Sequence, residues 1–132
     1  MEQPPSVQQG DWAVITLDGE IDLARVGDLA QILSSQWHPT KNLLIDLCSV
    51  SFMDSTGLRW LFDTYLDLVV AHREMRLIVV EGGPVERLLA IAGAEQVFFI
   101  YHNLDKALER LSARETLPQT NGPHSRFGLF DG

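Results

Sequence analysis

The sequence predicts an α/β domain in which a mostly parallel sheet of four to five strands carries about four packed helices. Three observations lead to this prediction. Segments rich in β-branched and apolar residues alternate along the chain with segments of helical periodicity. Clusters of Gly, Pro, Asn and Asp separate them. The chain has 132 residues, which suits one compact domain. Strands that alternate with helices favour right-handed βαβ crossovers and therefore a parallel sheet.

The first elements are expected to be a hairpin and a helix. Residues 12–17 read as a strand bounded by turn residues, and residues 6–9 as its partner across a turn at Gly10-Asp11. The apolar residues of segment 23–33 then recur at helical spacing. Asp22 precedes this segment and is predicted to be its N-cap.

The rest of the chain continues the alternation. Residues 43–47 read as a buried strand and residues 48–53 as a connecting loop. The later elements are expected to be a strongly amphipathic helix at 56–72, a strand at 75–80, a short helix at 85–92 between Pro84 and Gly93, a strand at 97–101 and a helix at 104–111. We therefore predict one domain over residues 1–113 and, because residues 114–132 have many turn formers and no period, a flexible C-terminal tail.

Composition limits the possible functions. The formal net charge is −8, which argues against direct nucleic-acid binding and suits either a basic protein partner or solubility alone. The apolar runs are too short to insert in a membrane, and the N-terminus lacks the features of a signal peptide. Cys48 is the only cysteine, so a disulfide or thiolate metal cluster is not expected and a cytoplasmic location is.

Two short motifs carry the functional hypothesis. Parallel strands end at the same sheet edge, so the expected Gly19-Glu20-Ile21-Asp22 loop should lie beside the Asp54-Ser55-Thr56-Gly57 loop. Ser55 stands where the long helix begins, and a hydroxyl there is a natural N-cap. The other interpretation is that Ser55 accepts a phosphate, which would sharpen the negative field of Asp54, Glu20 and Asp22. From the residues alone, the cap is the more frequent role.

The motif Phe52-Met53-Asp54-Ser55-Thr56-Gly57-Leu58 resembles the signature of STAS domains of the anti-sigma factor antagonist family, and Gly19-Glu20-Ile21-Asp22 resembles the first-loop motif of that family. The resemblance covers roughly residues 7–112. It implies a STAS-type fold and a serine switch. Ser55 would be phosphorylated by an anti-sigma factor that is itself a serine kinase, and a PP2C-type phosphatase would reverse the reaction. The unphosphorylated form would bind the kinase and free a sigma factor for transcription.

The same resemblance implies that Asp22 and Asp54 support phosphorylation or partner contact. The expected partner-binding surface also includes Thr56, Gly57, Arg59 and Trp60. Trp60 is either an exposed interface anchor, because Trp and Arg are enriched at binding hot spots, or a half-buried residue against a neighbouring helix. The sequence does not decide between these two positions. It also leaves the oligomeric state open.

Other functions fit less well. A hydrolase would need a Gly-x-Ser-x-Gly elbow, but Met53 lies two residues before Ser55, and none of the four histidines has an evident triad partner. We therefore expect no enzyme activity, no cofactor and no metal. A phospho-aspartate receiver would need a lysine at the end of the last strand, where Tyr101 and His102 stand. A STAS subunit of a lipid-transport or stress-sensing complex, acting as a protein-protein interaction module, remains the alternative.

Overall fold

A computed structural model describes residues 6–116, with β1 antiparallel at one edge of a five-stranded sheet and β2 to β5 parallel, in the order β1-β2-β3-β4-β5. The elements are β1 (Ser6–Gln9), β2 (Trp12–Ile21), α1 (Leu23–Gln36), β3 (Asn42–Met53), α2 (Ser55–Val70), β4 (Met75–Ile78), α3 (Pro84–Ile91), a 3-10 helix (Ala94–Gln96), β5 (Phe99–Tyr101) and α4 (Leu104–Thr116). The predicted fold class and the hairpin between β1 and β2 are confirmed.

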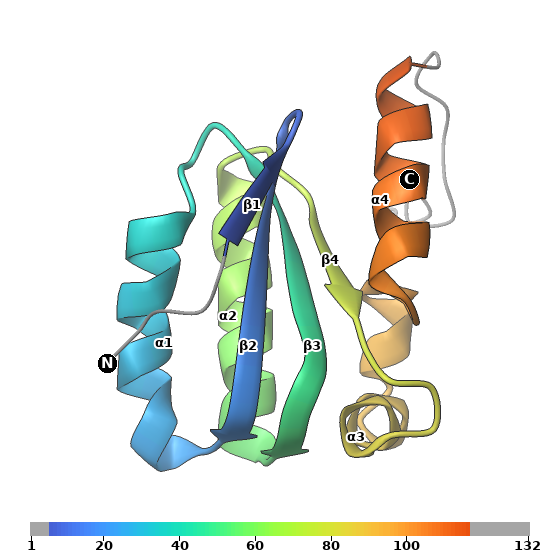
Figure 1. Cartoon of the computed structure of the whole chain (residues 1–132). Coiled ribbons are helices and arrows are strands. Elements are labelled where there is room, and N and C mark those ends of the chain that lie inside the picture. The colour runs from blue at the N-terminus through green and yellow to red at the C-terminus, as the bar shows by residue number, and fades with distance from the viewer. Residues whose placement is uncertain (1–5, 117–132) are drawn as a thin grey trace.

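The helices cover both faces of the sheet. On one face, Ala13, Ile15 and Leu17 of β2 pack with buried residues of α1, α2 and α3. On the other face, Trp12 and Val14 pack with Ala107 and Leu111 of α4. Figure 1 shows α1 and α2 running beside the long strands β2 and β3, with α4 set apart from them near β4. The alternation of side chains along β2 thus explains two separate apolar layers.

The strands β2 and β3 are longer than the sequence predicted. The expected loop at 48–53 and the first part of the Gly19 motif are strand, because they pair with each other in parallel as Gly19 with Val50 and Ile21 with Met53. Register shifts between Thr16 and Asp18 and between Gly19 and Glu20 make this end of the pair irregular. Each strand therefore connects to its helix through one residue, and both junctions lie at the same sheet edge.

Several predicted boundaries agree with the structure. Pro84 occupies the first turn of α3, and Gly93 follows that helix with a φ of 71°, which favours glycine. Other boundaries differ. β4 ends at Ile78 and β5 begins at Phe99, so both strands are shorter than expected. Helix α4 continues to Thr116, which is inside the segment predicted as a tail, and the rest of that segment lies outside the described residues. Over residues 6–116, no helix is both long and apolar enough to cross a membrane.

Candidate functional site

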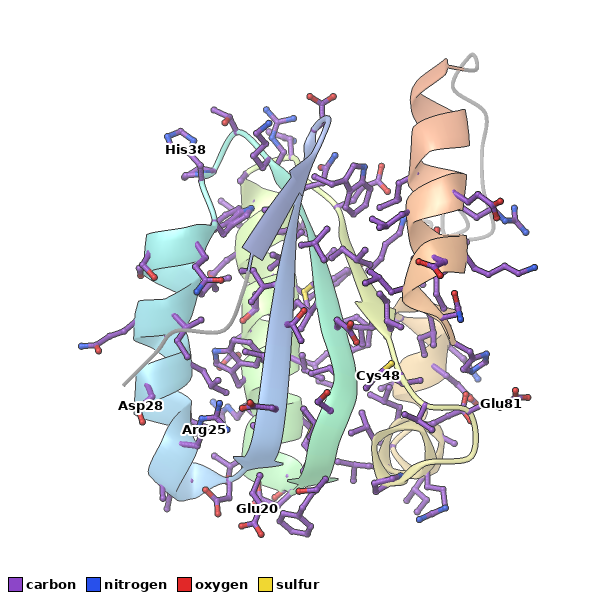
Figure 2. The ribbon with its side chains drawn as sticks, in the orientation of Figure 1. Glu20, Arg25, Asp28, His38, Cys48 and Glu81 are labelled. Carbon is purple, nitrogen blue, oxygen red and sulfur yellow. The ribbon has the colours of Figure 1, made fainter. Side chains whose placement is uncertain are left out.

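The two single-residue junctions bring both acidic motif residues to one edge of the sheet. Ile21 ends β2 and is paired with Met53, which ends β3, so Asp22 and Asp54 follow at matching positions. The Asp54 N–H also donates to the Ile21 carbonyl at 3.3 Å, which ties the second junction to the first strand. Glu20 lies at this same end of β2 (Figure 2). The two motifs therefore lie side by side, as expected, but they meet at the ends of strands and not in loops.

The residue that caps α2 is Asp54. Its backbone is extended, with φ −105° and ψ −171°, and its Oδ1 accepts the N–H of Thr56 at 2.9 Å and the N–H of Gly57 at 3.1 Å. The prediction that Ser55 is the N-cap is therefore wrong, because Asp54 precedes it and a carboxylate caps at least as well as a hydroxyl. Ser55 is the first residue of the helix instead.

This shift by one position changes the properties of Ser55. The residue is exposed, and within residues 6–116 its hydroxyl has no hydrogen-bonding partner. The helix N-terminus is stabilised by Asp54 without help from the serine. A hydroxyl that is both exposed and free of a structural hydrogen bond can be modified without a loss of native contacts.

Asp22 is at the N-cap position of α1, as predicted, but its side chain does not cap. The backbone is extended, with φ −136° and ψ −173°, and no cap hydrogen bond reaches the carboxylate. Only the Asp22 carbonyl takes part in the first turn, where it accepts the N–H of Arg25 at 2.9 Å and of Val26 at 3.2 Å. The carboxylate is half-buried and is not used by the helix.

Gly57 has a packing role in the structure. A Cβ atom at this position would lie 2.8 Å from side-chain atoms of both Ile21 and Met53 and 2.9 Å from the Ile21 carbonyl oxygen. Glycine therefore lets α2 begin directly against the two strand ends. Because Gly57 is buried, it cannot form the partner surface that the sequence predicted for it, whereas the neighbouring Thr56 is half-buried.

Trp60 belongs to the core. Only 9% of it is exposed, and it lines a small apolar space with Leu29 and Leu33 of α1. This decides the question that the sequence left open in favour of burial, so Trp60 is not an exposed anchor. Arg59 points the other way, with 82% of its side chain exposed, and its Nε lies 3.9 Å from Asp63 one helical turn later. Of these two predicted contact residues, Arg59 alone is available to a partner.

Two exposed apolar residues at the same edge were missed by the sequence reasoning. Phe52 is 48% exposed, is paired with Glu20 in the strand register and lies two residues before Asp54. Leu23 is 76% exposed at the start of α1, directly after Asp22. Their position in the sequence could have indicated this exposure, because an apolar residue beside a strand–helix junction cannot always reach the core. We call Glu20, Asp22, Leu23, Phe52, Asp54, Ser55 and Arg59 the switch edge.

Arg25 holds the end of β2 in its irregular shape. One guanidinium nitrogen donates to the Asp18 carbonyl at 2.7 Å and to the Glu20 carbonyl at 3.1 Å, and the other lies 3.6 Å from the Asp18 carboxylate. Gly19 stands between these carbonyls with a φ of 72°. Figure 2 shows Arg25 between α1 and this strand. The side chain thereby fixes the backbone that carries Glu20 into the switch edge.

The switch edge combines acids, apolar side chains, the exposed Arg59 and, within residues 6–116, one unbonded hydroxyl. Its chemistry suits recognition by another macromolecule and modification at oxygen. Within residues 6–116, no group of three His, Cys, Asp or Glu side chains is arranged to hold a metal ion.

Comparisons with known proteins agree with this architecture. The model of the STAS domain family matches residues 3–107. Among solved structures, an anti-sigma factor antagonist from Mycobacterium paratuberculosis superposes with a TM-score of 0.70 at 26% identity, over 83% of this chain and 93% of that one. The anti-sigma factor antagonist SpoIIAA, in its unphosphorylated form, superposes with a TM-score of 0.60 at 22% identity, over 83% of this chain and 96% of that one.

Proposed function

This chain belongs to the STAS domain family, and we propose that it is an anti-sigma factor antagonist controlled by phosphorylation of Ser55. The unphosphorylated form binds an anti-sigma factor that is a serine kinase, and the sigma factor which that kinase holds is released for transcription. A PP2C-type phosphatase returns Ser55 to the free hydroxyl. In this role the chain is a cytoplasmic binding protein and not an enzyme.

One observation carries the proposal. Ser55 is exposed and unbonded at the first position of α2, while Asp54 already accepts the amides of Thr56 and Gly57. In the transfer, the Ser55 oxygen attacks the γ-phosphorus of ATP, the bond from that phosphorus to the β–γ bridging oxygen breaks, and ADP leaves. The hydroxyl proton passes to a base of the kinase. Among residues 6–116, no native hydrogen bond has to break for the hydroxyl to react.

The occupied amides also determine what the phosphate does. A phosphoserine carries a charge of about −1.5 to −2 and three acceptor oxygens. A free helix N-terminus would attract such a group, but here the amides of Thr56 and Gly57 are taken by Asp54. The new charge therefore adds to that of Asp54, Asp22 and Glu20 at the switch edge. The modification changes the surface and leaves the fold as it is.

The partner surface follows from the same residues. Leu23 and Phe52 supply exposed apolar area on the two sides of the acidic junctions. A partner that buries these two side chains and places cations against Glu20 and Asp22 would match both the apolar and the acidic parts. Such a partner brings its own surface close to Ser55, where a dianion must lose its water on binding. Phosphorylation thus opposes the contact.

The modification is tested by intact-mass measurement after incubation with ATP and each purified anti-sigma serine kinase of the same genome. The wild type gains one phosphate and Ser55→Ala gains none. Ser51→Ala is the matched control, since Ser51 is another exposed serine just before the junction, and it gains one phosphate like the wild type. A phosphate on Ser55→Ala at the wild-type rate would refute the assignment.

A further inference from the structure

The free edge of the sheet at β5 is bordered by a groove of about 390 Å³. It is lined by Phe99, Ile100, Tyr101, His102, Asn103, Lys106 and Arg110. Five of these residues are consecutive. Because side chains of a strand alternate between its faces, a hollow that touches consecutive residues runs along the strand and not over one face. The groove therefore follows the open edge of the sheet.

The backbone of β5 has polar groups to offer on this side. Among the strands that the structure describes, β5 is the last in the sheet and pairs only with β4. The Tyr101 carbonyl accepts the Val79 N–H at 2.9 Å, so the backbone groups of Tyr101 face toward β4. Backbone groups alternate along a strand, and those of Ile100 face the open edge. An extended chain placed in the groove can hydrogen-bond with them.

The groove carries positive charge on an acidic protein. Lys106 and Arg110 are exposed and lie four residues apart on α4, while the acids Asp105 and Glu109 next to them do not line the groove. Among the residues that the structure describes, neither cation has an ion-pair partner. A ligand seated in the groove meets these two cations directly, whereas the carboxylate of Glu86, which bonds to the lining residue His102, already has a partner.

We propose that this groove docks an extended acidic segment of a partner protein, which lies along β5 with carboxylates at alternate positions. The spacing supports this ligand. Four residues of helix rise by about 6 Å, and alternate residues of a strand that point to one face are about 6.6 Å apart. Two carboxylates on one face of the segment thus match Lys106 and Arg110, while its backbone meets Ile100. No residue of the switch edge lines the groove.

Fluorescence anisotropy with labelled eight-residue peptides tests the proposal. The probe alternates threonine and glutamate, one control alternates threonine and lysine, and a second control has four glutamates in one block followed by four threonines. The alternating glutamate peptide binds best, the block peptide binds at least threefold more weakly at equal charge, and the lysine peptide does not bind. Lys106→Gln and Arg110→Gln each weaken the alternating peptide by about two- to fivefold. Arg87→Gln removes an exposed cation outside both the groove and the switch edge and leaves the affinity unchanged.

Amide hydrogen exchange on the complex tests the backbone contact. The Ile100 N–H becomes protected when the alternating glutamate peptide is present. Equal affinity for the alternating and block peptides, full affinity in Lys106→Gln and Arg110→Gln, or an unprotected Ile100 amide at saturation would each overturn the proposal. No measurable binding of any glutamate peptide would overturn it too.

Discussion

The Asp54 carboxylate accepts the backbone N–H of Thr56 at 2.9 Å, and this bond separates two roles that the sequence alone assigned to one residue. Capping of α2 belongs to Asp54, and Ser55 beside it keeps a free and exposed hydroxyl. Because Asp54 caps the helix, the first turn of α2 can stay intact when the charge on Ser55 changes. The two roles can be measured separately.

Stability measurements distinguish the two neighbours. Asp54→Ala is expected to lower the free energy of unfolding by about 0.5–2 kcal/mol, because the amides of Thr56 and Gly57 lose their acceptor. Ser55→Ala is expected to change it by less than about 0.5 kcal/mol, as for an exposed residue without a structural bond. Urea unfolding of both variants, with Asp54→Asn as a capping control, gives the comparison. A larger loss in Ser55→Ala than in Asp54→Ala would contradict the assignment of the cap.

Gly57 offers a second test of how α2 meets the strand ends. Gly57→Ala is expected to cost about 1–3 kcal/mol, because its Cβ would lie 2.8 Å from atoms of Ile21 and Met53. Gly27→Ala is the matched control inside α1, where no atom lies within 4 Å of the added Cβ, and it is expected to stabilise by about 0.5–1 kcal/mol. Thermal unfolding measures both. Opposite signs are expected, and a neutral Gly57→Ala would rule out the close approach.

Phe52 and Trp60 separate binding from packing. Phe52→Ala is expected to weaken binding of the kinase by more than about 1 kcal/mol and to leave stability nearly unchanged, since the side chain is 48% exposed. Trp60→Ala is expected to lower stability by about 3–5 kcal/mol, because the ring is buried against α1. Calorimetric titration and urea unfolding measure the two quantities. If Trp60→Ala were as stable as the wild type but bound the kinase more weakly, Trp60 would be an interface residue and the assignment to the core would be wrong.

Glu86 predicts a dependence of stability on pH. Its pKa lies below the ordinary value of 4.5, first because the Gly82 N–H donates to one carboxylate oxygen at 2.7 Å and then because His102 bonds to the other. A lowered folded-state pKa stabilises the native state above about pH 4.5, and this contribution disappears as pH falls through the folded pKa. Glu86→Gln should therefore be less stable than the wild type at pH 7, by about 0.5–1 kcal/mol, and the gap should be smaller at pH 3. Urea unfolding at both pH values measures the gap. A gap of constant size would contradict the argument.

The order of elements was predictable because local signals agree with the fold. Pro84 and Gly93 limit a helix by their own backbone preferences, and the hairpin turn at Gly10 has a φ of 60°, which the glycine allows. The extra length of β2 and β3 was not predictable in this way. Ser49 and Ser51 look like loop residues, but they are exposed positions of a strand in which Val50 is buried. The hydrogen bonds that make this segment a strand come from β2, far away in sequence.

The site was predictable in part for a similar reason. The motif placed Asp54 and Ser55 at the end of a strand, but which of the two caps the helix depends on where the first helical turn begins. Trp60 was ambiguous because α2 is covered by both the sheet and α1, which widens its buried arc beyond one apolar stripe. Thr64 shares that arc and satisfies its hydroxyl by donating to the Trp60 carbonyl at 2.8 Å.

The affinity of the anti-sigma serine kinase for the unmodified protein and for the Ser55 phospho-form is the most direct test of the proposed switch. Isothermal calorimetry with both forms is expected to give a drop of roughly a hundredfold or more on phosphorylation, because a dianion among Asp54, Asp22 and Glu20 must lose its water when the partner binds, while Asp54 already holds the amides of Thr56 and Gly57. Ser55→Asp should weaken binding less, as it adds one charge and two oxygens. Equal affinity of the kinase for the unmodified and phosphorylated forms would contradict the switch.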